Sequence, residues 1–91
     1  MRLGRQYRIS GRVHGVGFRV FTQAAAAREG IQGWVRNVPG GSVEIAAEGD
    51  AEALERFERA IRQGPAGARV DHVDVIDTGA GGRDTGFEVR Q

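Results

Sequence analysis

The order of strand-like and helix-like segments constrains the fold of this chain more than any other feature of its sequence. Apolar residues at alternating positions predict strands at 6–13, 31–37, 42–48 and 69–76, with a short terminal strand at 87–90. Apolar residues at helical spacing, each run followed by a glycine, predict helices at 19–29 and 51–63. Glycine- and proline-rich segments predict a turn at 38–41 and a loop at 78–86.

This order is β-α-β-β-α-β plus a short terminal strand. It predicts an antiparallel-rich sheet with both helices on one face, which is a ferredoxin-like α/β sandwich of the α+β class. A chain of 91 residues is the size of one modest core, so we expect a single domain over residues 1–91.

Each element shows an apolar side that predicts its part of the core. The predicted core positions are Tyr7, Ile9 and Val13 in the first strand, Val20, Phe21, Ala24 and Ala27 in the first helix, Val43, Ile45 and Ala47 in the third strand, and Leu54, Phe57 and Ile61 in the second helix. Asp50 is a candidate N-cap of the second helix. The outer face of that helix carries the i, i+4 pairs Glu52/Arg56, Glu55/Arg59 and Glu58/Arg62, which indicate a solvated face and not a binding patch.

The topology also predicts where a functional site lies. The first two strands are joined by a helical crossover, so they run in the same direction and end at the same edge of the sheet. A glycine-containing loop follows the first strand, and Asn37 ends the second. We therefore expect the loop and Asn37 to lie close together.

The loop has the residue types of an anion-binding nest. Gly15 and Gly17 permit backbone torsions that turn successive N–H groups inward, and the start of the following helix adds further unpaired N–H groups. Arg19 can present its planar guanidinium to two phosphate oxygens. The alternative is a tight strand-to-helix turn followed by a surface arginine. Spacing alone leaves both interpretations open.

Asn37 is the second candidate. Its neutral side-chain amide could orient a water molecule for attack. Asn is also common in turns, so a turn-forming role before Pro39 is the alternative.

The composition excludes several kinds of chemistry. There is no cysteine, which excludes disulfides, thiolate metal sites and a Cys nucleophile. All 13 basic residues are arginine, which excludes a Schiff-base lysine and a lysine phosphate clamp. His14 and His72 are a poor metal set, and the run Asp71, Asp74 and Asp77 lacks calcium-loop spacing, so no metal site is predicted. A net charge of +1 and the lack of a long apolar segment predict a cytoplasmic protein that binds neither nucleic acid nor membrane.

The loop from Gly11 to Arg19, together with the segment from Gly33 to Asn37, resembles the acylphosphatase family. The likeness extends over nearly the whole chain from about residue 5. It implies a ferredoxin-like sandwich in which Arg19 binds phosphate and Asn37 positions the attacking water. It further implies a backbone phosphate cradle formed by His14, Gly15, Val16, Gly17 and Phe18. His14 stands where the family usually has glutamine, so we expect its backbone N–H to matter more than its imidazole.

This resemblance agrees with the chemistry that the residues allow. An acyl phosphate leaves as a carboxylate whose conjugate acid has a pKa near ~4, so its departure needs no general acid. The expected reaction is hydrolysis of the carboxyl–phosphate bond of a small acyl phosphate, without metal or cofactor, by a monomer. The rivals are a nucleic-acid-binding module of the same topology and a regulatory or carbamoyl-phosphate-handling domain. The predicted third strand lacks the aromatic residues that an RNA-binding sheet would carry there.

Overall fold

The computed structural model describes residues 1–82 and 85–91. The elements in chain order are β1 (Arg2–Arg12), α1 (Phe18–Glu29), β2 (Gln32–Val38), β3 (Ser42–Asp50), α2 (Ala51–Gln63), β4 (Arg69–Asp77) and β5 (Phe87–Arg90). The predicted order is confirmed, and β1 and β3 are longer than expected. Positions 83–84 of the predicted loop 78–86 lie outside the described residues.

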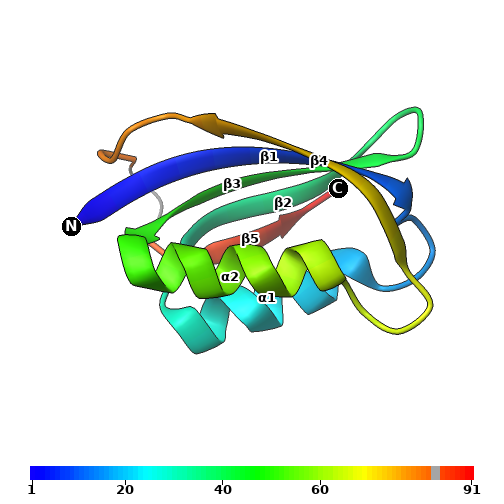
Figure 1. The fold of residues 1–91 in the computed structure, drawn as a ribbon, viewed down its shortest axis with the longest axis horizontal. Helices are drawn as coiled ribbons and strands as arrows, with labels where there is room; N and C mark the ends of the chain where they lie inside the picture. Colours follow the sequence, from blue (N-terminus) through cyan, green and yellow to red (C-terminus); the bar gives the residue numbers. More distant parts are fainter. Residues whose placement is uncertain (83–84) are drawn as a thin grey trace.

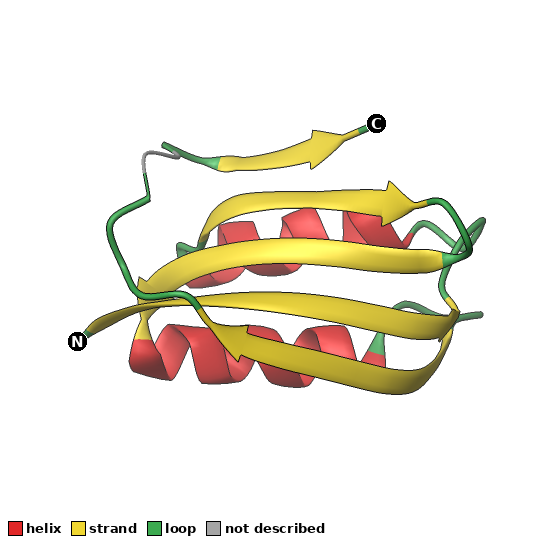
Figure 2. Ribbon diagram, turned by 90° about the horizontal axis from the view of Figure 1, so that it is seen from above, coloured by secondary structure: helices red, strands yellow, loops and turns green. Residues whose placement is uncertain are grey.

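The five strands form one sheet in the order β4-β1-β3-β2-β5. Strand β5 pairs parallel with β2, whereas the other three pairings are antiparallel. Both helices cover one face of the sheet (Figure 1), and the opposite face is open, as seen in front of the helices in Figure 2. The predicted antiparallel-rich α+β sandwich is therefore confirmed.

The core lies between the sheet and the two helices. The predicted strand positions and the three predicted positions of α2 are all buried, and the rings of Tyr7 and Phe57 meet with centroids 6.2 Å apart. Gly30 ends α1 with a φ of 67°, as expected for a helix terminated by glycine. Asp50 is the N-cap residue of α2, but its side chain makes no capping hydrogen bond.

The predicted buried face of α1 is wrong. The structure buries Phe18, Thr22, Ala25 and Ala26 and leaves Val20 66% exposed. The helix begins one residue earlier than expected, and the large ring of Phe18 enters the core and sets the rotation of the helix. Thr22 can be buried because its hydroxyl donates a hydrogen bond of 2.8 Å to the carbonyl of Phe18. Ala24, Ala27 and Val20 consequently face outward, with Phe21 at the boundary.

The charged face of α2 is solvated, but its pairing differs from the prediction. Glu58 and Arg62 form the expected pair at 3.0 Å. Arg56 instead contacts Glu29 of α1 at 2.7 Å, so it joins the two helices.

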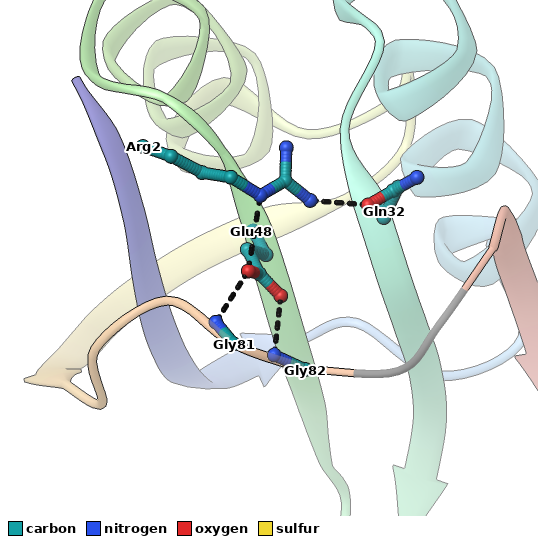
Figure 3. A network of polar contacts seen from close by, with 5 residues as sticks. All are labelled: Arg2, Gln32, Glu48, Gly81 and Gly82. Carbon is teal, nitrogen blue, oxygen red and sulfur yellow. Dashed lines mark hydrogen bonds and ion pairs between the residues drawn. The ribbon is translucent and has the colours of Figure 1, made fainter.

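Residues 78–82, which follow β4, cross the end of the sheet and are fastened there by Glu48 of β3 (Figure 3). The N–H groups of Gly81 and Gly82 donate to the two carboxylate oxygens at 2.7 and 3.0 Å, and Arg2 donates to the same carboxylate at 3.1 Å. Arg2 also contacts Gln32 of β2. We call residues 78–82 the strap. It brings the chain from one edge of the sheet toward β5 at the other edge.

Candidate active site

The loop between β1 and α1 contains two left-handed glycines. Gly15 and Gly17 have φ values of 72° and 76°, and among the described residues only glycines have positive φ. A Cβ atom at either glycine would meet no other atom within 4 Å. Backbone torsion, not lack of space, therefore demands glycine at both positions.

The N–H groups of this loop have no acceptor in the part of the chain that the structure describes. In residues 1–82 and 85–91, the N–H groups of residues 14–20 donate to no backbone or side-chain acceptor, and Phe21 makes the first helical bond, to Gly17. Unpaired N–H groups at a helix N-terminus carry partial positive charge and favour an anion. The predicted nest thus has the donors that a phosphoryl group requires.

Arg19 lies in the first turn of α1, beside the loop. Its Nη1 donates a hydrogen bond of 2.8 Å to the carbonyl oxygen of Arg90 at the end of β5. A guanidinium has five N–H donors, so this contact fixes the side chain and leaves other donors for a ligand. The carbonyl of Arg90 was not predicted, because a backbone acceptor 71 residues away leaves no trace in the sequence.

Asn37 lies in β2 opposite Val43 of β3, close to the carboxyl end of its strand. Its side chain is half-buried, and within the described part of the chain its amide makes no hydrogen bond to protein. An amide that is held on a strand and free of protein partners is available to bind water.

These residues meet in one small pocket of about 160 Å³. It is lined by Val13, Gly15, Gly17, Phe18, Arg19, Val20, Asn37 and Val89. A water molecule takes about 30 Å³ of liquid volume, so the pocket has room for a phosphoryl group with a water beside it. The structure therefore brings Arg19, Asn37 and the glycine loop together, as the parallel direction of β1 and β2 predicts.

His14 and Val16 belong to the loop but do not line this pocket. The imidazole of His14 turns away, and its Nε2–H donates a 2.7 Å hydrogen bond to the carbonyl of Ser42, at the start of β3. This bond ties the loop to the turn that follows Asn37.

The other polar candidates have ordinary partners. Asp71 pairs with Arg69 at 2.9 Å, and Asp74 pairs with His72 at 3.0 Å. No group of three His, Cys, Asp or Glu residues that could hold a metal occurs among the described residues. No helix in the described part is long and apolar enough to cross a membrane.

Fold and pocket together define the class: a ferredoxin-like α+β domain with its site between the first strand and the first helix. The family model described as acylphosphatase matches residues 5–89. An acylphosphatase of Salinibacter ruber is 50% identical over 84 residues, which cover 92% of this chain and 88% of that protein. An acylphosphatase of Rubrobacter xylanophilus is 49% identical over 82 residues, covering 90% of this chain and 74% of that one.

The solved structures agree with this assignment. The crystal structure of acylphosphatase from Bacillus subtilis matches with a TM-score of 0.94 and 35% identity, over 98% of this chain and 99% of that one. Full-length HypF, described in a phosphate- and nucleotide-bound form, matches with a TM-score of 0.88 and 26% identity, over all of this chain but 12% of HypF. The chain belongs to the acylphosphatase family, as its two sequence motifs predict.

Proposed function

We propose that this chain hydrolyses the carboxyl–phosphate bond of small acyl phosphates, releasing a carboxylate and inorganic phosphate. The observation that carries the proposal is the meeting of Arg19, Asn37 and the unpaired N–H groups of the glycine loop in one pocket. The acylphosphatase relatives support it.

Binding starts at the phosphoryl group. In this mechanism the N–H groups of residues 14–18, of which Gly15, Gly17 and Phe18 line the pocket, cradle its oxygens, and Arg19 adds two charge-assisted hydrogen bonds. Because Arg90 already holds the guanidinium, little side-chain freedom is lost on binding. The same donors stabilise the charge that develops on the phosphoryl oxygens in the transition state.

The attacking water is held by Asn37. The oxygen of this water forms a bond to phosphorus while the bond between phosphorus and the acyl oxygen breaks. The electron pair of the broken bond leaves with the carboxylate. One proton of the water passes to a phosphoryl oxygen of the substrate. The products are the carboxylate and dihydrogen phosphate, so the step needs neither a protein acid nor a protein base.

The leaving group is the reason why the mechanism uses no metal or cofactor. A carboxylate is stable at neutral pH, whereas an alkoxide leaving group would need a proton or a Lewis acid. We further propose that the chain acts as a single-domain monomer in the cytoplasm, without nucleic acid. Its lack of cysteine supports a reducing compartment.

The test is phosphate release from benzoyl phosphate by the purified chain and by two arginine variants. Arg19→Ala should abolish most turnover, whereas Arg28→Ala is the matched control, because Arg28 is an exposed arginine in the last turn of the same helix. Turnover that is absent from the parent, or that survives equally in both variants, would contradict the proposal.

A further inference from the structure

Helix α1 carries an apolar stripe on its solvent side. Val20, Ala24 and Ala27 are all exposed, and Val20 retains 66% of its accessible surface. They lie at i, i+4 and i+7, so they form one line along the helix. Their exposure is unexpected for residues that the sequence pattern places in the core.

The stripe forms one wall of a groove of about 660 Å³. The opposite side of the groove contains Ile31, just before β2, and Phe87, the first residue of β5. Gln23 reaches across and donates a 3.2 Å hydrogen bond to the carbonyl of Phe87. Among the described residues, no charged side chain lines this groove. From Val20 to Ala27 the stripe runs about 10 Å, since a helix rises about 1.5 Å per residue. That length suits an acyl chain of several carbons.

Val20 joins this groove to the phosphate pocket. It lines both hollows, and it follows Arg19 directly in the sequence. The other apolar side chains of the phosphate pocket, Val13, Phe18 and Val89, are buried or half-buried. Val20 is therefore the apolar surface that a ligand meets on leaving the pocket.

We infer that the groove along α1 is the subsite for the acyl group, and that it favours acyl phosphates with an extended apolar chain. The inference rests on the proposed function, because it takes the phosphoryl group to lie in the glycine loop. The acyl carbon is separated from phosphorus by one oxygen, so the acyl group must emerge at the rim of the pocket. There the apolar stripe offers contact to methylene groups and no partner to a charged chain.

The expected signature is a dependence of kcat/KM on chain length. Each methylene group removed from water by an open groove should raise kcat/KM about twofold to fourfold. Over the series acetyl, butyryl and hexanoyl phosphate, kcat/KM should therefore rise at each step. Affinity for inorganic phosphate, which has no acyl group, provides the internal reference.

The experiment compares Val20→Ser with the control Ile76→Ser. Ile76 is 61% exposed on β4, so the control removes a similar apolar side chain that does not touch the groove. Val20→Ser should lower the hexanoyl-to-acetyl ratio of kcat/KM at least threefold, whereas Ile76→Ser should leave that ratio unchanged. Ala24→Gln, placed further along the groove, should lower kcat/KM for hexanoyl phosphate and spare acetyl phosphate.

An equal effect on all three substrates, or a ratio unchanged in both groove variants, would overturn the acyl subsite while leaving the hydrolase intact. A parent protein that hydrolyses none of the three would overturn the proposed function itself. The two failures are thus distinguished by the parent's own activity.

Discussion

Arg19 is the residue on which the proposed chemistry depends most. We expect Arg19→Ala to lower kcat by about 10²–10³, which is the usual loss when one preorganised donor to a developing charge is removed. Arg19→Lys should fail almost as badly, because an ammonium cannot reproduce the planar fork that contacts Arg90 and that, in the proposed mechanism, also binds the phosphate. Steady-state kinetics with an acyl phosphate measure both losses. Near-parental turnover in Arg19→Lys would contradict a bidentate role for the Arg19 guanidinium.

Asn37 should act on the water and not on the phosphate. Asn37→Ala is therefore expected to lower kcat strongly while inhibition by inorganic phosphate stays within about threefold. The two quantities are measured on the same preparation, with folding checked by circular dichroism. If phosphate inhibition is lost as well, Asn37 belongs to the phosphate site and the water must be held elsewhere.

His14 has a structural partner that suggests a role for its side chain. Its Nε2–H donates to the carbonyl of Ser42, and a glutamine amide can donate to the same carbonyl. We expect His14→Gln to keep turnover and phosphate inhibition within a few-fold of the parent, because the glutamine amide can replace the donor to the carbonyl of Ser42. His14→Leu, which cannot donate, should weaken phosphate inhibition more than His14→Gln does. A hundredfold loss in His14→Gln would place the imidazole in the reaction.

At the scale of the elements, the strands and α2 could be predicted, whereas the orientation of α1 could not. Alternation in β1 and β3 identifies their buried residues because apolar side chains such as Tyr7, Ile9 and Ile45 share one face of the sheet. Helix α1 has alanines on nearly every side, so its composition does not decide which side is buried. The burial of Phe18, one residue before the predicted helix, determines which side of α1 faces the core.

The strap contains the clearest pH-dependent contact. Hydrogen bonds from the backbone N–H of Gly81, together with Arg2 and Gly82, hold the pKa of the Glu48 carboxyl below its usual range. A carboxyl with a lowered folded-state pKa stabilises the fold above its unfolded-state pKa, and this stabilisation is lost as the pH falls through the folded-state value. The strap should thus loosen only in acid.

Glu48→Gln tests this contact. The variant should unfold at a lower temperature than the parent at pH 7, because a neutral amide cannot accept both N–H groups and pair with Arg2. The difference should shrink as the pH falls below the usual pKa range of a glutamate, because the parent's own carboxyl becomes protonated in acid. Thermal melts followed by circular dichroism give the comparison, with Glu55→Gln as an exposed glutamate control. A difference that is independent of pH would contradict the assigned ionic role.

At the scale of the whole molecule, the topology explains how so small a chain assembles a site. Strands β1 and β2 both pair antiparallel with β3, so their carboxyl ends lie at one edge and place the loop beside Asn37. This part could be predicted from the order of the elements. The contribution of β5 could not, because Arg90 acts through its backbone carbonyl and Glu48 fastens the strap through backbone N–H groups. Contacts to the backbone do not depend on a recognisable side chain at the other end.

The most direct test of the proposed mechanism is the fate of oxygen-18 during hydrolysis of an acyl phosphate in labelled water with excess chelator. The proposed mechanism has water attack phosphorus in the pocket of Arg19 and Asn37 without a metal ion. It predicts undiminished turnover in chelator, with the label in inorganic phosphate and none in the carboxylate. Label in the carboxylate, or activity that stops in chelator and returns with added magnesium, would contradict it.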